Sequence, residues 1–115
     1  MSLRSAMNVA LSGIQYASTS TSIYANNLAN QRTDGFKESS PTAEAQAVGG
    51  VRLSSIRTNE SQGSIAAGVE LSNTDIAANI LAVDDAARLM KTSMAALKTT
   101  GEMFDSLLLL GRNKD

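Results

Sequence analysis

The chain has 115 residues, which is enough for one domain, and its 3% aromatic content without tryptophan predicts thin helix–helix contacts and marginal stability as a monomer. Its formal net charge of −1 lacks the strong basic excess typical of nucleic-acid-binding proteins. The sequence has no histidine or cysteine, which excludes disulfides, thiolate chemistry and the usual protein ligands of zinc, haem and non-haem iron.

A long helix is predicted over residues 3–30, with Ser2 as its N-cap. Its apolar and small residues recur at alternating spacings of four and three, which is typical of a coiled-coil seam. At about 1.5 Å per residue the helix would be about 42 Å long. The expected seam residues are Leu3, Met7, Ala10, Ile14, Ala17, Thr21, Tyr24 and Leu28.

This helix carries no charged residue between Ser5 and Gln31. An ordinary surface helix places lysine and glutamate on its solvent face. A helix that is polar only through hydroxyl and amide groups is better suited to being surrounded by protein. Gly13 here, and Gly101 later in the chain, each cost a helix about 1 kcal/mol relative to alanine, which favours close helix approach over a hinge.

Three asparagines, Asn26, Asn27 and Asn30, lie in the last turns of this helix. Helix-terminal carbonyls lack intrahelical partners, and an uncharged amide can bond to them even in a dry interface. The interpretations are simple capping, or capping together with contact to another subunit, and we favour the second. The turn that follows includes Thr33, Gly35, which is free to adopt positive φ, and Phe36, which anchors the exit.

The middle, residues 37–71, is rich in glycine, serine and threonine and contains the single proline. The alternation in residues 51–58 (VRLSSIRT) predicts a short strand, and residues 64–71 (SIAAGVEL) could pair with it as a hairpin. The alternative is an irregular segment that neighbouring molecules order.

A second long helix is predicted over residues 73–110, about 57 Å in length. Ser72 or Asn73 is expected to cap it, with Asp75 in its first turn, and Gly111 to end it. The seam residues expected here are Ile76, Ile80, Val83, Ala87, Met90, Met94, Leu97, Gly101, Phe104 and Leu108. Because both seams have the same period, the helices should pair as an antiparallel coiled-coil hairpin.

Apolar residues outside the two seams, such as Leu11, Leu81 and Leu107, add surface that one pairing cannot cover, and this predicts self-association. The longest apolar run, Leu107–Leu110, is far shorter than the roughly 20 residues of a membrane span. Polar residues including Asn8 and Gln15 interrupt the N-terminal apolar stretch, so we expect no cleaved signal peptide.

The sequence also argues against catalysis. Ser-His and Cys-His pairs are impossible, and no glycine pattern matches a nucleotide-binding loop. Asp84 and Asp85 are adjacent on a helix and therefore point about 100° apart, which suits paired acid–base chemistry poorly. We expect no enzyme activity, no cofactor and no metal.

Several motifs of this chain are similar to those of the bacterial flagellar rod and hook proteins of the axial structure. Near the N-terminus these are Ala10–Gln15 (ALSGIQ), Ala25–Asn30 (ANNLAN) and Thr33–Lys37 (TDGFK), with Asp34 where the family usually has proline. Later motifs are Ser72–Ile76 (SNTDI) and Lys98–Met103 (KTTGEM). Between these, Arg88–Ser93 (RLMKTS) has methionine and serine where the family usually has tyrosine and asparagine.

The resemblance implies a short, proximal-rod-like subunit of the flagellar basal body. Residues 1–36 and 72–115 would form the paired helices of an inner axial domain, and residues 37–71 an irregular or small β insertion. Such a subunit polymerises into a hollow axle that transmits torque and allows export through its channel. Its partners would be copies of itself, other rod and hook axial proteins, and the flagellar type III export apparatus, with no nucleic acid and no direct membrane span.

The resemblance also implies a location in the periplasm-spanning rod, reached by export without a cleaved signal peptide. The residues expected to form the subunit contact and turn are Asn26, Asn27, Asn30, Thr33, Gly35, Phe36, Asn73 and Asp75. The alternative function is a cytosolic helical-hairpin adaptor that binds one partner helix; helical periodicity by itself does not distinguish the two.

Overall fold

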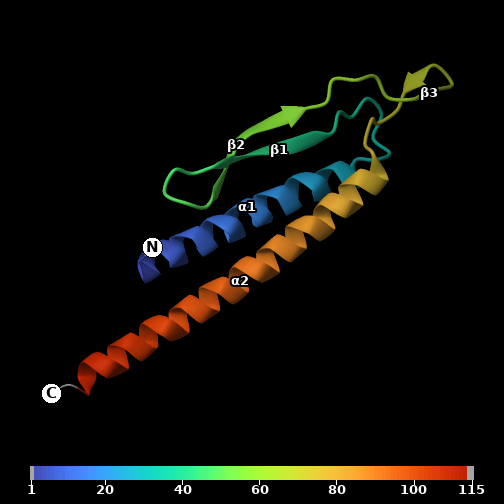
Figure 1. Ribbon diagram of the computed structural model, residues 1–115. Coiled ribbons are helices and arrows are strands. Elements are labelled where there is room, and N and C mark those ends of the chain that lie inside the picture. The colour runs from blue at the N-terminus through green and yellow to red at the C-terminus, as the bar shows by residue number, and fades with distance from the viewer. Residues whose placement is uncertain (1, 114–115) are drawn as a thin grey trace.

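The computed structural model describes residues 2–113. Two long helices lie side by side and run antiparallel, and a β-hairpin lies along the first of them (Figure 1). The molecule is elongated, with principal dimensions of 79 × 23 × 14 Å. The elements are α1 (Leu3–Ala29), β1 (Ser39–Ala45), β2 (Val51–Thr58), β3 (Ile65–Ala66), β4 (Val69–Glu70) and α2 (Ile76–Arg112). The predicted helical hairpin with a short β middle is confirmed; Met1, Lys114 and Asp115 of the predicted terminal ranges lie outside the described residues.

Helix α1 begins and ends with local caps. Ser2 Oγ accepts a hydrogen bond from the Ser5 amide at 3.1 Å, as expected for an N-cap. At the other end, the Asn30 amide donates to the Asn26 carbonyl at 3.1 Å, and Asn30 Nδ2 donates to the same carbonyl at 2.9 Å. Asn30 therefore satisfies a carbonyl that the end of the helix would leave without a partner.

Helix α2 begins later than the sequence predicted. Its N-cap is Asp75, whose Oδ1 accepts from the Ala78 amide at 3.0 Å, so the expectation of Ser72 or Asn73 as the cap is corrected. Ser72 Oγ instead accepts from the Thr74 amide at 3.2 Å, and the Asn73 side chain is engaged with the preceding loop. The side chains of Ser72 and Asn73 thus stabilise the turn before the helix. Asp75, the last residue before α2, is left to cap it.

The predicted strand at residues 51–58 is present as β2, but its partner differs from the one expected. It pairs antiparallel with β1, with a bulge between Thr42 and Ala43, and not with residues 64–71. Those residues pair with one another as β3 and β4. The reason is local: Ala67 and Gly68 have positive φ, at 51° and 79°, and close a tight turn inside that segment.

The β1–β2 hairpin lies directly against α1. The Val51 amide donates to Ser12 Oγ at 3.1 Å. A Cβ built on Gly50 would lie 2.5 Å from Ser12 Oγ, and one built on Gly49 would lie 3.2 Å from a Val9 methyl carbon. Both glycines also have positive φ, so they close the hairpin turn and permit its close approach to the helix.

The contact between α1 and α2 is made of small and polar side chains. On α2 the buried residues recur at every seventh position, as in a coiled-coil seam. A Cβ built on Gly13 would lie 2.4 Å from Ser93 Oγ, so the helices are closer there than a larger side chain would permit. The buried residues are Ala10, Gly13, Ala17, Ser20 and Asn27 on α1 and Asn79, Ala86, Ser93 and Thr100 on α2.

These positions have the predicted period but partly occupy a different face. Twelve predicted seam residues are buried or half-buried: Leu3, Met7, Ala10, Ile14, Ala17, Thr21, Tyr24, Leu28, Val83, Met90, Leu97 and Gly101. Six others are corrected, because the structure places them on the exposed surface: Ile76, Ile80, Ala87, Met94, Phe104 and Leu108. Small residues at 79, 86 and 93 take the place expected for 80, 87 and 94, because helices this close cannot accommodate bulky side chains between them.

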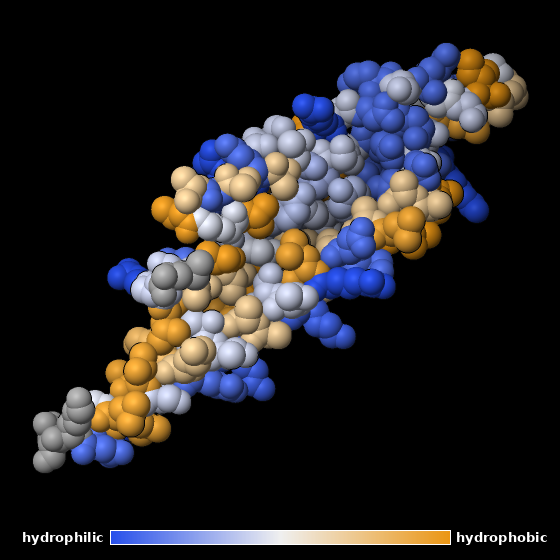
Figure 2. Space-filling model, viewed as in Figure 1, coloured by the Kyte–Doolittle hydropathy of each residue, from blue (hydrophilic) through white to orange (hydrophobic). Residues whose placement is uncertain are grey.

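Helix α2 is longer than α1, and its C-terminal end continues past the start of α1 (Figure 1). We call residues 103–110 the overhang. Its apolar side chains are between 46% and 63% exposed, and Figure 2 shows hydrophobic surface gathered at this end of the molecule. They are Met103, Phe104, Leu107, Leu108, Leu109 and Leu110. Neither α1 nor α2, the two long helices of the described part, has the length and hydrophobicity required to cross a membrane.

Candidate subunit-contact site

Asn27 joins three elements at the closed end of the hairpin. Its side chain is buried, with 1% exposure, between the end of α1, the start of β1 and the start of α2. Asn27 Nδ2 donates to the Ser39 carbonyl at 2.6 Å and to Asn79 Oδ1 at 2.8 Å, and its Oδ1 accepts from the Ser39 amide at 2.9 Å. The uncharged amide of Asn27 thus forms hydrogen bonds with both β1 and α2 in a buried position, where a charged side chain would be costly.

Asn79 and Glu38 extend this network. Asn79 Nδ2 donates to Glu38 Oε2 at 2.8 Å and to the Asp75 carbonyl at 2.7 Å. Glu38 Oε2 also accepts from the Asp75 amide at 3.1 Å. The connection that leaves α1 and the first turn of α2 are therefore bonded to each other through side chains. We call Asn27, Glu38 and Asn79 the amide latch.

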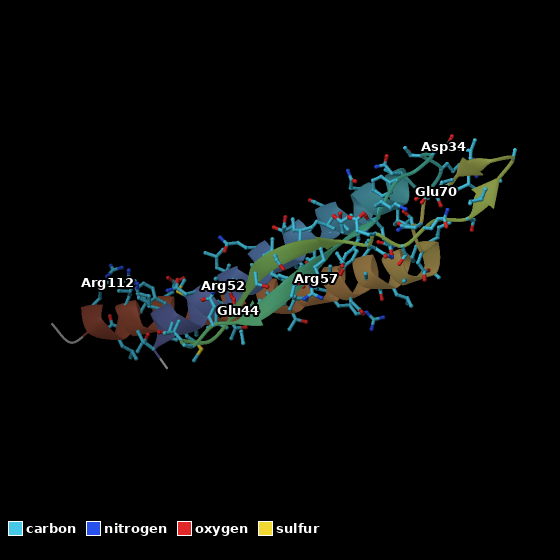
Figure 3. All side chains as sticks on the ribbon, turned by 90° about the horizontal axis from the view of Figure 1, so that it is seen from above. Asp34, Glu44, Arg52, Arg57, Glu70 and Arg112 are labelled. Atoms are coloured by element: carbon cyan, nitrogen blue, oxygen red, sulfur yellow. The ribbon has the colours of Figure 1, made fainter. Side chains whose placement is uncertain are left out.

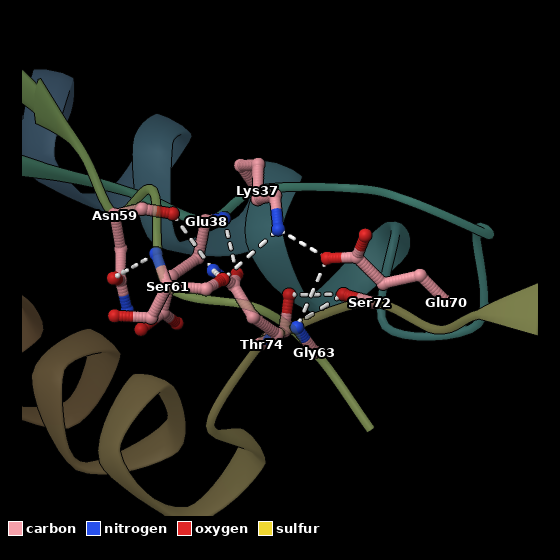
Figure 4. A network of polar contacts seen from close by, with 9 residues as sticks. Lys37, Glu38, Asn59, Ser61, Gly63, Glu70, Ser72 and Thr74 are labelled. Atoms are coloured by element: carbon pink, nitrogen blue, oxygen red, sulfur yellow. Dashed lines mark hydrogen bonds and ion pairs between the residues drawn. The ribbon is translucent and has the colours of Figure 1, made fainter. Parts of the chain in front are cut away.

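A second polar cluster, shown in Figure 4, holds the loop beyond the latch. Asn73 Nδ2 donates to the Asn59 carbonyl at 2.7 Å and to the Ser61 carbonyl at 2.9 Å. Lys37 forms an ion pair with Glu70, whose Oε1 also accepts from the Gly63 amide at 3.0 Å. The hydrogen bond from Lys37, together with that from Gly63, holds the pKa of the Glu70 carboxyl below its usual value.

An open groove follows one flank of the helix pair. Its larger part, with a volume of about 400 Å³, lies between Ala6, Ala10 and Gly13 of α1 and Leu89 and Ala96 of α2. All of its lining residues are uncharged, and small side chains on both helices leave it hollow. We call this part the small-residue groove.

Leu89 also borders a smaller hollow of about 180 Å³ further along the same two helices. Tyr16, Tyr24 and Asp85 line this second hollow, together with Ser20, whose buried hydroxyl has no hydrogen-bond partner. Burial, together with the charges of Tyr16 and Asp85, raises the pKa of Tyr24 above its usual value. Asp85 is the acidic residue of the smaller hollow.

The β1–β2 hairpin carries three charged residues, Glu44, Arg52 and Arg57. Figure 3 shows Glu44, Arg52 and Arg57 along the hairpin, with Arg112 at the far end of α2. Arg52 Nη2 lies 3.0 Å from Glu44 Oε2, and both side chains are half exposed, so this pair contributes little to stability. In the described part of the chain, no three acidic side chains come together in a cluster that could hold a metal ion.

Residues 7–37, which contain Asn27, match the family model described as flagella basal body rod protein. Over these residues the chain is similar to that family, which confirms the resemblance seen in the N-terminal motifs. A search of curated proteins found no match.

The rod-family match covers most of α1 and the exit to β1, including Gly13, Asn27 and Gly35. It supports a structural role in the flagellar rod, a location in the basal body and assembly with other rod proteins. The family is a structural component of the flagellum and not a known enzyme family.

The structure divides the predicted contact residues into two groups. Asn27, Asn73 and Asp75 are engaged within the chain, in the amide latch, the loop cluster and the α2 cap. For Asn27 the expectation of a subunit contact is corrected, since a side chain with 1% exposure has no surface left for a neighbour.

The other predicted residues lie at the end of α1 and in the turn that follows it. Asn26 is exposed, and Thr33 Oγ1 donates to Asn30 Oδ1 at 3.0 Å. Gly35 has the expected positive φ, at 71°, and its amide donates to the Glu70 carbonyl at 2.8 Å. Phe36 is half-buried, and its carbonyl accepts from the Asn73 amide at 3.1 Å. Asn26, near the end of α1, and Gly35, in the turn after it, are both exposed.

Sequence reasoning missed Asn79, Glu38 and Ser93. A signal was available for two of them: Asn79 and Ser93 belong to the heptad 79, 86, 93 and 100, whose members are all small or polar. A prediction that looks for the largest apolar side chains does not identify such residues as a helix contact. Glu38 had no comparable signal, because its role depends on the turn that brings β1 next to α2.

Proposed function

We propose that this chain is a subunit of the flagellar basal-body rod that polymerises helically into a hollow axle, which transmits torque and leaves a channel for export. The α1–α2 pair would be the inner axial domain, with residues 1–36 and 72–115 contributing to it and residues 37–71 forming an outer insertion. The chain would reach the rod through the flagellar type III export apparatus without cleavage of a signal peptide.

The observation that carries this proposal is the surface of the helix pair. The two helices bury small and polar residues against each other, and α2 leaves most of its large apolar side chains exposed. A monomer with this distribution gains little from folding, whereas a subunit surrounded by copies and by other rod and hook proteins covers that surface. Helix α1, which carries no charged residue after Arg4, fits the same environment, because each charge buried in such an assembly would require a partner.

The torque role rests on the shape and on the latch. A subunit 79 Å long whose closed end is fixed by side-chain hydrogen bonds between α1, β1 and α2 resists relative sliding of its helices. Packed against neighbouring subunits, such helix pairs would make a stiff tube. The rival function, a cytosolic adaptor that binds one partner helix, would need only one groove and not apolar surface along the whole molecule.

The test is to follow the chain in motile cells with an epitope inserted between Ala67 and Gly68. This turn is exposed and lies at the tip of the short β3–β4 hairpin, away from both helices, so it should tolerate an insertion (Figure 1). We expect the tagged chain to co-purify with isolated basal bodies, and deletion of its gene to abolish rod assembly and motility.

A chain that stays in the cytosol, with intact basal bodies in the deletion strain, would contradict the rod proposal and favour the adaptor. An electron cryo-microscopy map of isolated basal bodies would then show whether density for the helix pair lies in the rod wall. An untagged strain serves as the control for motility.

A further inference from the structure

The small-residue groove is an open site that its own chain leaves unfilled. Its walls are small and apolar residues of α1 and α2, such as Gly13 and Ala96, together with Gly50 and Val51 of the β-hairpin, and its volume is about 400 Å³. It is apolar and open to the surface, so a bulky apolar side chain entering it would leave water without having to desolvate a charge.

The overhang is an apolar helix end that has no groove to occupy in its own chain. Residues 106–111 (SLLLLG) contain no charge, and the leucines and Phe104 are about half exposed. In the helix pair, Gly13 lies opposite Ser93 and Asn27 opposite Asn79, so the sum of paired residue numbers is constant. By that register the start of α1 lies opposite residue 103, and the rest of the overhang has no α1 segment beside it.

The overhang cannot fill the groove of the same molecule. Leu89 and Ala96 of the groove and the whole overhang belong to one continuous helix, α2 (Ile76–Arg112). A continuous helix cannot fold back on its own preceding turns. The occupant therefore comes from another chain, and a second copy brings to every groove an apolar helix end in which Asp105 is the one charged residue.

We propose that the overhang of one copy docks into the small-residue groove of the next copy, with Phe104, Leu107 or Leu108 entering between α1 and α2. This contact rests on the proposed rod function and names the surfaces through which the subunits would join. Because the overhang and the groove are different surfaces of the same chain, a one-way contact leaves each end copy with a free overhang or groove, so copies can add in a ring or in an open helix.

The experiment uses the natural absence of cysteine in the full-length chain. One preparation carries Ala96→Cys in the groove, and the other carries Phe104→Cys, Leu107→Cys or Leu108→Cys in the overhang. The two are mixed and oxidised. A disulfide forms only when the two Cα atoms come within about 7 Å, so cross-linking reports direct docking. We expect at least one overhang position to form the mixed disulfide with Ala96→Cys in preference to either self-disulfide.

The matched control replaces Ala96→Cys with Ala77→Cys, an equally exposed alanine of α2 outside the groove, and the mixed disulfide should be lost. A second variant, Ala96→Phe, fills the groove and should abolish concentration-dependent sedimentation, whereas Ala77→Phe should keep it. Circular dichroism of each variant shows that helix content is unchanged, so that loss of docking is not loss of folding.

Three results would overturn the proposal: predominant overhang–overhang disulfides, equal cross-linking to Ala77→Cys, or a monomer at every concentration. Localisation separates this failure from that of the rod function. A chain found in basal bodies that gives no groove–overhang cross-link would overturn only the docking proposal. A chain that cross-links as expected but never enters basal bodies would overturn the rod function alone.

Discussion

Neighbouring residues of the same type have opposite roles at the end of α1. Asn26 is exposed and its side chain makes only a long contact, with Asn30 Nδ2 at 3.4 Å from its Oδ1. Asn27, one position on, points about 100° away around the helix and enters the space between α1, β1 and α2. Helical geometry thus gives one asparagine three interactions inside the fold and leaves the other for solvent or a neighbouring subunit.

We expect Asn27→Ala to lower the free energy of unfolding by about 2–3 kcal/mol, because it removes three hydrogen bonds and leaves buried groups of Ser39 and Asn79 without partners. Asn26→Ala is the matched control and should change it by less than about 0.5 kcal/mol. Urea unfolding followed by circular dichroism measures both. Equal effects of the two substitutions would contradict the role assigned to the latch.

At the scale of elements, the packing of the two helices depends on the small size of the side chains between them and not on the burial of large hydrophobic ones. Gly13 and Ser93 meet where the helices are closest, while Met94 and Ile80 remain outside. Close approach increases dispersion contacts between the backbones, but it limits each buried side chain to a few atoms. The pair therefore has modest stability of its own and leaves apolar surface for other contacts.

Gly13→Leu should push the helices apart and destabilise the fold by about 1–3 kcal/mol, because the new side chain would overlap Ser93. Gly101→Leu adds the same side chain to the other glycine inside a long helix, where a Cβ meets no atom within 4 Å. That control should be neutral or stabilise by up to about 1 kcal/mol through helix propensity. Thermal unfolding of the two variants compares them, and a harmless Gly13→Leu would refute close approach at this site.

The β3–β4 hairpin has its own pH dependence. The pKa of Glu70 is lowered, so its ionised form is favoured by folding; this stability is present above the ordinary pKa and is lost as the pH falls through the folded pKa. Between about pH 5 and pH 3, the wild type should therefore lose more stability than Glu70→Gln. Urea unfolding at several pH values measures the difference, and nuclear magnetic resonance of the Gly63 amide reports the titration directly. Parallel pH profiles would show that the Lys37–Glu70 pair has no such effect.

At the scale of the whole molecule, the chain is a narrow strip with hydrophobic surface along its length and at one end (Figure 2). Its only wholly buried hydrophobic side chains, among residues 2–113, are those of Ala10, Ala17 and Ala86. An isolated chain with so small a core is expected to be weakly stable. Assembly would supply the missing burial, which links folding to self-association.

The melting temperature should consequently rise with protein concentration, by about 4–8 °C for each kcal/mol that association contributes. Leu108→Glu should weaken this dependence, because it places a charge in the overhang. Leu11→Glu, on the exposed face of α1, is the control for a charge elsewhere. Differential scanning calorimetry over a wide concentration range makes the measurement, and a melting temperature independent of concentration would rule out coupled folding and association.

The local pattern of the sequence was sufficient for the two helices, their length and pairing, the Ser2 cap, the turn at Gly35 and the strand at residues 51–58. Each depends on periodicity, capping chemistry or backbone freedom within a few residues. The family resemblance was also available, because its motifs are contiguous.

Only the tertiary structure decided which flank of each helix faces its partner, and that Asn27 belongs to the interior. Moving a seam by one position turns a helix face by about 100°, and the periodicity is the same on either flank. The choice is made by the distance between the helices, which Gly13 and Ser93 set together across 80 positions of sequence. For the same reason the partner of β2 and the role of Glu38 could not be predicted, since they depend on where the chain returns.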